Sequence, residues 1–304
     1  MTDDSLSPDE AFAVLGDETR IAILRSLFER PYEPMTFSEL REAVGMADSG
    51  QFNYHLNKLV GQFVRKTEEG YELRLAGWQV LGAILSGTYT ESGNVEPVEA
   101  DHPCRRCGGV VVATYEDERM TIRCTDCDEQ YSSAGVPPGV LDGFEREELV
   151  DRFDRFMRGL VAQARLGVCV SCSGRMDAEV LTDPDPEIGV DVESIPGVVY
   201  RCRRCPEVVS ASFGSALLDH PEIVAFHWEH GVDLRHVPSW TLAWLTDDHA
   251  TVESEDPLRV RLVVELGDEA GVEDTKTGGA GGAGGAVLEL LIDENLEAVE
   301  VTRR

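Results

Sequence analysis

The sequence predicts a multidomain protein of the α+β class. Three observations support this. The first ninety residues place apolar side chains at helical spacing and end in two short alternating segments around a glycine. All eight cysteines fall in C-x-x-C pairs in the middle of the chain. Alternating apolar segments near the end predict strands. At 304 residues the chain has room for two or three small domains.

Two helices are predicted in the first 35 residues. Pro8 to Leu15 gives the first helix, with apolar side chains along one side. Asp17 to Phe28 gives the second, in which isoleucine, leucine and phenylalanine recur at helical spacing. Pro31 and Pro34 follow it, and proline cannot continue a helix.

The next segment predicts two helices joined by a tight turn. Thr36 and Glu39 form a capping box, in which a hydroxyl and a carboxylate satisfy free N–H groups at a helix start. The helix that they open, Phe37 to Val44, ends at Gly45. We expect Ser49 to cap the second helix, which extends to Gly61 and has apolar side chains along one face.

A short hairpin is predicted after these helices. Phe63 to Thr67 and Tyr71 to Leu75 alternate in polarity around Gly70. Two helices followed by a hairpin indicate a winged helix-turn-helix, which is a DNA-binding fold. The polar face of its second helix and the basic side chains of the hairpin give the candidate contacts to base edges and phosphates: Ser49, Gln51, Asn53, Tyr54, Asn57, Lys58, Arg65 and Lys66.

The charge pattern favours the same interpretation. The whole chain has a net charge of −30, yet residues 49–67 contain no acidic side chain and hold two of its three lysines. This indicates an anion-facing surface, although chance local composition would give the same pattern. Acidity spread along a lysine-poor chain looks like adaptation to a very salty cytoplasm. Because phosphate contacts weaken as salt rises, uncharged contacts should carry more of the recognition.

Two motifs resemble ArsR-type winged-helix regulators over about residues 9–90. Leu15 to Leu24 is similar to the opening of that family, and His55 to Leu59 is similar to its recognition-helix pattern. Ser49 to Leu56 looks like the version found in regulators of extremely halophilic archaea. The resemblance implies contacts to double-stranded DNA from the second helix and the wing, at Gln51, Asn53, Tyr54, Asn57, Arg65 and Lys66.

The resemblance also implies a homodimer. Ala76 to Tyr89 predicts a further helix, and in the family such a helix joins the first helix in a dimer interface. Closing the core of the monomer is the alternative role. Two-fold DNA sites need a dimer, so we expect one. Metal-sensing members carry cysteines on the helix before the turn, whereas residues 1–103 contain none, so metal sensing there is not expected.

The cysteines predict two structural zinc sites. Paired cysteines in a cytosolic chain are more often zinc knuckles than disulfides, and four thiolates close a tetrahedral shell without an open position. The ligands are Cys104, Cys107, Cys124 and Cys127 in a first ribbon, and Cys169, Cys172, Cys202 and Cys205 in a second. The first ribbon should contain strands Val110 to Tyr115 and Met120 to Arg123. The second carries an acidic insertion, Thr182 to Ser194.

The grouping of the cysteine pairs leaves one alternative open. A cross-braced arrangement would mix pairs from both sets, but a long amphipathic helix, Phe144 to Leu166, should hold the sets apart. Arginines beside the knuckles could reach phosphate, although exposed knuckle arginines are the commoner case: Arg105, Arg106, Arg203 and Arg204.

The C-terminal region predicts a helical segment and a β-hairpin. Ser215 to Asp247 looks helical and is rich in Trp and His, which we interpret as core and surface residues; its aromatic residues are candidates for a small-effector pocket. Leu258 to Leu266 and Ala286 to Ile292, followed by Ala298 to Thr302, alternate as strands. Gly267 to Gly285 lacks the Gly-Lys-Ser/Thr of a phosphate-binding loop, so we expect a flexible insertion.

These segments predict a domain order. It runs as the winged helix (1–90), an acidic linker (91–101), the first ribbon (102–142), a connecting helix (143–166), the second ribbon (167–212) and an α/β tail (213–304). The acidic start lacks the apolar region of a signal peptide, and no stretch approaches about 20 apolar residues, so we expect a soluble, cytoplasmic protein without a membrane partner.

The function that the sequence favours is sequence-specific transcriptional regulation. One alternative is a protein-interaction scaffold of the transcription machinery without a DNA site of its own. The other, an enzyme with a catalytic zinc, is the weakest, because Cys₄ shells leave no open coordination position and no general base stands at a motif spacing. We therefore do not expect an enzyme.

Overall fold

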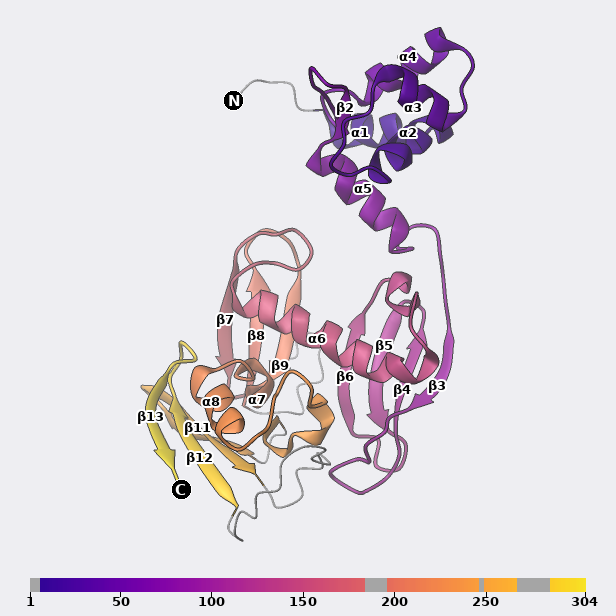
Figure 1. Cartoon of the computed structure of the whole chain (residues 1–304). Coiled ribbons are helices and arrows are strands. Elements are labelled where there is room, and N and C mark those ends of the chain that lie inside the picture. The colour runs from indigo at the N-terminus through magenta and orange to yellow at the C-terminus, as the bar shows by residue number, and fades with distance from the viewer. Residues whose placement is uncertain (1–5, 184–195, 246–248, 267–284) are drawn as a thin grey trace. The chain divides into compact units, whose positions relative to one another are not determined.

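The computed structural model describes residues 6–183, 196–245, 249–266 and 285–304. Within these residues the protein is mixed α+β, with four small antiparallel sheets (Figure 1). The chain divides into two compact units. The first contains residues 1–93 and 137–142, and the second contains residues 94–136 and 143–304. No helix of the described residues is long and apolar enough to cross a membrane.

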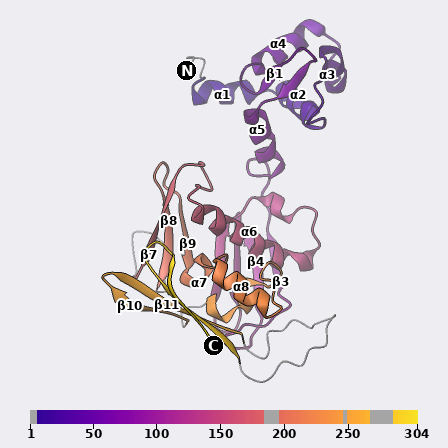
Figure 2. The same ribbon diagram turned by 60° about the vertical axis from the view of Figure 1, so that its left-hand side comes forward.

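The first unit holds five helices and one hairpin among its described residues (Figure 2). They are α1 (Pro8–Leu15), α2 (Glu18–Phe28), α3 (Phe37–Val44), α4 (Ser49–Leu59), β1 (Val64–Lys66), β2 (Tyr71–Leu73) and α5 (Leu75–Leu85). The predicted capping box opens α3, with the Thr36 N–H donating to Glu39 Oε2 at 2.8 Å. Gly45 ends α3 at φ +73°, a left-handed conformation that glycine adopts without strain.

The cap of α4 differs from the expectation. Asp48, not Ser49, accepts the free N–H groups, from Gly50 at 2.8 Å and from Gln51 at 3.0 Å. Ser49 is instead the first residue of the helix, which ends at Leu59 and not at Gly61. A carboxylate stabilises this position by its favourable interaction with the helix dipole.

The core of the first unit is formed by the predicted apolar stripes. Side chains from α2, α3, α4 and the hairpin are buried together; they include Ile23, Leu24, Leu40, Phe52, Leu56, Leu59 and Val64. The short 3₁₀ turn η1 (Pro138–Leu141) belongs to the same unit, where the Gly139 N–H donates to the Ser86 carbonyl at 2.8 Å. A Cβ at Gly139 would lie 2.9 Å from Ser86 Cα, so the close approach requires glycine.

The second unit begins with a sheet of order β3-β4-β5-β6. Its strands are β3 (Val95–Glu99), β4 (Val111–Glu116), β5 (Arg119–Cys124) and β6 (Gln130–Gly135). Strand β3 lies inside the expected acidic linker, so the linker interpretation was wrong for these residues. Pro97 argued against a strand, because proline cannot donate a ladder hydrogen bond. Proline is tolerated here because β3 is an edge strand and its register shifts between Val95 and Val98.

Helix α6 (Leu149–Arg165) contacts both sheets that carry the cysteines (Figures 1 and 2). The expected start at Phe144 was too early. Glu145 and Glu148 form a capping box around a short 3₁₀ turn, η2 (Arg146–Glu148), and the α-helix follows it. The buried Phe153 stacks on Tyr115 of β4 at a centroid distance of 6.2 Å, which fixes α6 on the first sheet.

The second cysteine sheet has the order β7-β8-β9 and leads into short helical pieces. The elements are β7 (Met176–Leu181), β8 (Gly197–Cys202), β9 (Val208–Ser212), α7 (Phe213–Ala216), α8 (Pro221–Glu229), η4 (Ser239–Thr241) and η5 (Ala243–Leu245). Residues 215–245 are therefore less helical than expected, because Gly231 adopts φ +79° and Pro238 interrupts any continuation. Most of the expected Thr182 to Ser194 loop lies outside the described residues.

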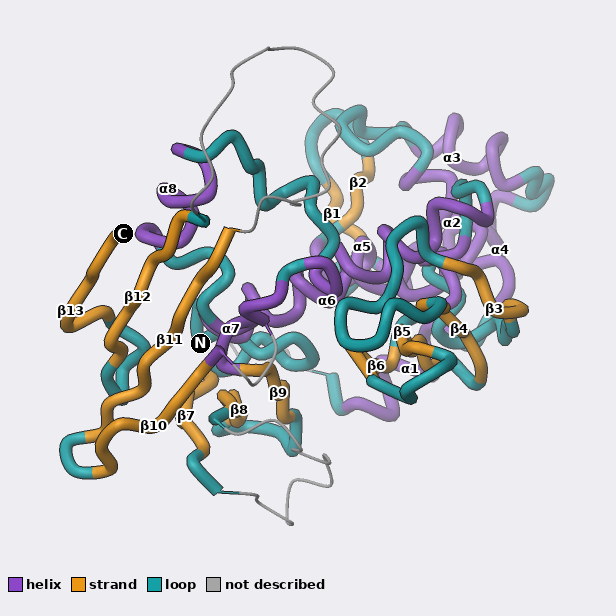
Figure 3. The backbone as a smooth tube through the Cα atoms, turned by 90° about the horizontal axis from the view of Figure 1, so that it is seen from below, coloured by secondary structure: helices purple, strands orange, loops and turns teal. Residues whose placement is uncertain are grey.

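The chain ends in a four-stranded antiparallel sheet rather than a simple hairpin (Figure 3). Its order is β10 (Ala250–Glu255), β11 (Leu258–Leu266), β12 (Ala286–Ile292) and β13 (Ala298–Arg303). The three predicted strands are present, and β10 was missed. Apolar residues of this sheet share one buried cluster with α7, α8 and the β7–β9 sheet. The glycine-rich segment 267–285 lies outside the described residues, except for Gly285.

Candidate functional site

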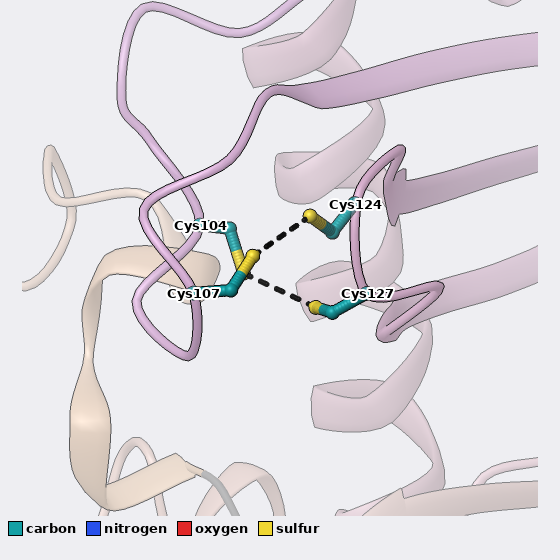
Figure 4. A group of neighbouring side chains, drawn as sticks. All are labelled: Cys104, Cys107, Cys124 and Cys127. Carbon is teal, nitrogen blue, oxygen red and sulfur yellow. Dashed lines mark hydrogen bonds between the residues drawn. The ribbon is translucent and has the colours of Figure 1, made fainter.

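The eight cysteines form two compact groups of four, as the sequence predicted; Figure 4 shows the first group. In the first group, Cys104 Sγ lies 3.7 Å from Cys127 Sγ, and Cys107 Sγ lies 3.5 Å from Cys124 Sγ. Sulfurs at about 2.3 Å around a tetrahedral zinc are about 3.8 Å apart, whereas a disulfide requires about 2.0 Å. The distances therefore fit a metal shell and exclude a disulfide between these atoms.

The second group repeats this geometry in the β7–β9 sheet. Cys169 Sγ lies 3.6 Å from Cys205 Sγ, and Cys172 Sγ lies 3.5 Å from Cys202 Sγ. Each group contains cysteines from its own sheet only, so the cross-braced alternative is wrong. All ligand atoms in a group lie within 4.8 Å of one another. Both groups are consistent with structural zinc sites, in which four thiolates leave no position for substrate.

Backbone N–H groups of the knuckle turns point at the sulfurs. The Gly109 N–H donates to Cys107 Sγ at 3.4 Å, and the Asp126 N–H donates to Cys124 Sγ at 3.4 Å. In the second group the Arg204 N–H donates to Cys202 Sγ at 3.3 Å, and this hydrogen bond, together with those from the Cys205 N–H and the neighbouring thiols, lowers the pKa of Cys202 to about 6. Such donors favour the thiolate, which is the form that binds metal.

A tyrosine adds a side-chain donor to the first group. The Tyr131 hydroxyl donates to Cys104 Sγ at 3.1 Å. Burial raises the pKa of Cys104, but the hydrogen bonds from Tyr131 and from backbone N–H groups bring it down to about 6. Burial raises the pKa of Tyr131 itself, so its proton stays in place as a donor. Tyr131 was not predicted as a site residue, because only its position four residues after Cys127 marks it in the sequence.

Acidic partners hold two of the four arginines beside the knuckles. Arg106 is ion-paired with Glu129 at 2.5 Å, and the Arg203 guanidinium donates to Asp177 Oδ1 at 2.9 Å. Burial lowers the pKa of Arg105. Since two of these charges are already compensated, phosphate binding at the knuckles loses support.

The candidate interface on α4 forms one exposed face. Gln51, Asn53, Tyr54, Asn57 and Lys58 are exposed, and the side chains on the opposite face, Phe52, His55, Leu56 and Leu59, are buried. Ser49 is exposed in the first turn.

Partners within the unit already engage the basic residues of this region. Arg65 Nε lies 2.6 Å from Glu72 Oε1 across the hairpin, where the two residues are in register. Lys66 lies 5.7 Å above the Tyr71 ring, and Lys58 lies 5.7 Å above the Tyr54 ring. Arg65 and Lys66, the predicted hairpin contacts, therefore lie on one exposed strand, but Glu72 compensates the charge of Arg65.

A buried histidine joins α4 to α2. His55 is 8% exposed, and its Nδ1 lies 3.2 Å from Asp17 Oδ1. Asp17 also caps α2, where it accepts the Arg20 N–H at 3.1 Å. The sequence analysis treated His55 only as part of a motif. Its contact with Asp17 joins α4 to the start of α2.

The histidines of the C-terminal region include one core residue, as expected. His227 is fully buried; Trp244 Nε1–H donates to its Nε2 at 3.2 Å, and its Nδ1 contacts the Ile223 carbonyl at 2.8 Å. Nδ1 therefore carries the proton, and burial lowers the pKa of His227. Among the described residues, the groups that could hold a metal contain no histidine.

Comparisons with known proteins add family matches without a function. Residues 101–272, more than half of the chain, match the family described as Domain of unknown function (DUF7351). Residues 8–84 match the one described as Domain of unknown function (DUF7347). No curated protein and no solved structure matches the chain.

Proposed function

The chain belongs to the family described as Domain of unknown function (DUF7351), and we propose that it is a sequence-specific DNA-binding transcriptional regulator. The observation that carries this proposal is the exposed face of α4. It presents five side chains that donate or accept hydrogen bonds and no carboxylate, in a chain of net charge −30. Amide side chains read adenine edges, and a tyrosine hydroxyl contacts phosphate or base edges.

The shape of the element supports entry into the major groove. Helix α4 has 11 residues and so spans about 16 Å, with a diameter that a groove about 12 Å wide admits. Helix α3 precedes it across a tight turn, and the β1–β2 hairpin follows it, which is the order of a winged helix-turn-helix. The resemblance to ArsR-type regulators implies the same use of these elements.

A second copy of the chain is part of the proposal. Helices α1 and α5 and the segment after α5 expose large apolar side chains: Phe12 is 69% exposed, Leu85 62% and Tyr89 74%. Covering them in a two-fold dimer would place two α4 helices on successive major-groove half-sites. The two Cys₄ modules then serve assembly or sensing in the second unit, with zinc in a structural role.

The test is in vitro selection of DNA from a random library at molar potassium chloride. We expect the wild-type protein to enrich a two-fold symmetric site, and Asn53→Ala with Tyr54→Ala to lose sequence preference at least tenfold. Each lost base contact is worth about 1–3 kcal/mol, which corresponds to about 5-fold to 150-fold, so two lost contacts together exceed tenfold. Tyr32→Ala is the matched control, because Tyr32 is 91% exposed outside the α4 face. If the double variant selects the same DNA site as the wild type, α4 does not read the DNA sequence and the proposal is contradicted.

A protein-interaction scaffold of the transcription machinery is the second candidate. Acidic groups flank the α4 face: Asp48 caps its first turn, Glu72 pairs with Arg65, and Glu68 and Glu69 are exposed at the tip of the hairpin. These carboxylates weaken phosphate contacts. Stable co-purification with polymerase, together with a selection that enriches no DNA site, would favour this candidate.

A further inference from the structure

A cavity of about 870 Å³ lies in the second unit, between the edges of its two cysteine-bearing sheets. Strand β6 is the last strand of one sheet and β9 is the last strand of the other. Both strands and α6 contribute lining residues to the cavity. Figure 1 shows α6 running past both sheets. Nothing in the proposed DNA contacts uses this space.

Both edge strands turn main-chain groups away from their own sheets. The Val136 N–H donates to the Glu118 carbonyl at 2.8 Å, so the alternation of an antiparallel ladder turns Ser133 and Gly135 away from β5. The Cys202 N–H donates to the Glu207 carbonyl at 3.1 Å, and the same alternation turns Ser210 away from β8. The cavity is therefore flanked by two rows of N–H and C=O groups at strand spacing.

Two buried polar atoms beside this space have no hydrogen-bond partner among the described residues. They are Ser132 Oγ on β6 and Trp240 Nε1, and both residues line the cavity. Both atoms are closed off from solvent, so an occupant of the cavity does not reach them where they stand, and the pairing has to come from the strand edges.

The charged side chains around the cavity are balanced in sign. Asp154 and Arg158 form an ion pair at 2.9 Å, Arg165 pairs with Asp219 at 2.9 Å, and Glu129 is held by Arg106. Arg119 donates to Ser133 Oγ at 3.2 Å, and Glu207 accepts a hydrogen bond from the Ser171 hydroxyl. A lining without net charge suits an uncharged occupant and disfavours a nucleotide or another anion.

We propose that an extended, uncharged peptide segment of a partner protein binds in this cavity as an added β-strand. Main-chain groups of β6 and β9 supply the pairing, and the small side chains of Ala134 and Ala211 leave room for it. Strands β6 and β9 have 6 and 5 residues, so the paired segment spans about 17 Å. Small or aliphatic residues in that segment match the hydroxyl and alanine lining.

The decisive variant is Ser210→Pro, compared with Ser210→Ala. Proline removes the outward N–H of Ser210 without breaking a bond to β8, whereas alanine keeps it. The probe is a displayed library of random seven-residue peptides, selected against the zinc-loaded full chain at molar potassium chloride. Zinc content and the melting temperature report whether each variant is folded.

We expect the enriched peptides to be uncharged over about five residues, to bind Ser210→Ala within twofold of wild type, and to lose at least tenfold in affinity for Ser210→Pro. If Ser210→Pro does not fold, N-methylation of the peptide replaces it. Alternate N–H groups of the added strand face β6 and the groups between them face β9, so methylation of either set should lower the affinity at least tenfold. A library without binders, charged binders, equal affinity for both variants, or N-methylated peptides that bind as tightly as the unmethylated peptide would each overturn the proposal.

Discussion

At the scale of single residues, Tyr131 has the most direct influence on a metal site. Its hydroxyl donates to Cys104 Sγ at 3.1 Å, while no side-chain hydroxyl is recorded on a sulfur of the second group among the described residues. Donors of this kind stabilise the thiolate and orient the ligand, and their removal typically lowers metal affinity by about 10–100-fold.

We therefore predict that Tyr131→Phe lowers the zinc affinity of the first group about tenfold and leaves the second group unchanged. Competition with a chromophoric chelator measures both sites in one sample, so the second group is the internal control. Cys104→Ser should remove the first zinc altogether. A zinc affinity of the first group that is the same in Tyr131→Phe as in the wild type would show that the hydroxyl does not support the metal site.

Site residues could be predicted from the sequence where their partners lie only a few positions away along the chain. They could not be predicted where the partners are distant in sequence. The cysteine ligands and the Thr36–Glu39 box follow from spacings of a few residues. The contact of His55 with Asp17 joins positions 38 apart, and that of Trp244 with His227 joins positions 17 apart. Neither pair has a sequence signature, because the partners meet only after the helices have packed.

At the scale of elements, the sequence predicted helices and strands best where one face is apolar and the other polar. Strands β11 and β12 were predicted at their observed bounds, because their alternation is regular. Strand β3 was not predicted because Pro97 and the glutamates beside it are typical of a loop. Strand β10 was not predicted because its outward positions are mostly polar. The expected helix over residues 215–247 failed because a tryptophan-rich apolar run suits buried loops and helices equally.

Helix α8 is joined to the turn η5 by a neutral histidine. His227 accepts a hydrogen bond from Trp244 through Nε2 and is bonded to Ile223 through Nδ1, and burial lowers its pKa. A depressed pKa means that the folded protein holds His227 neutral. In the unfolded chain the histidine takes up a proton below about pH 6.5. The contribution of neutral His227 to the free energy of unfolding is therefore complete above that pH and is lost as the pH falls.

We predict that the free energy of unfolding of the wild type falls between pH 7.5 and 5.5 more steeply than that of His227→Gln. Glutamine retains an acceptor for Trp244 but does not titrate, so the difference in slope isolates His227. Denaturant unfolding at several pH values measures it, with zinc content followed in the same samples. Parallel slopes would mean that His227 does not titrate on unfolding.

The free energy of zinc binding at one structural site is comparable with the free energy of unfolding of a whole domain. Binding free energies of structural zinc are about 10–16 kcal/mol, and whole domains are stable by only about 5–15 kcal/mol. The β-turns that carry Cys107 and Cys127 have few buried residues of their own. We therefore expect metal removal to loosen the cysteine turns of both sheets, whose strands also contribute buried apolar side chains, and to leave the cysteine-free apolar core of the first unit intact.

At the scale of the whole molecule, the two units carry different candidate sites. The first offers an exposed polar helix face, and the second offers two closed Cys₄ groups and a cavity between sheet edges. The acidity that surrounds both suits a protein whose solubility must survive high salt, where carboxylates hold water and screening removes charge repulsion. In that setting, the specific DNA binding that we propose would rest on uncharged contacts, for which Asn53 and Tyr54 are the candidates.

Genome-wide binding of the tagged protein in its host tests the central claim most directly. The comparison is between the wild type and the Gln51→Ala, Asn53→Ala, Tyr54→Ala triple variant at equal expression. We predict sharp peaks over a shared two-fold symmetric sequence that disappear in the variant. Absent peaks, or peaks at every promoter that survive the three substitutions, would contradict a DNA-reading role for α4.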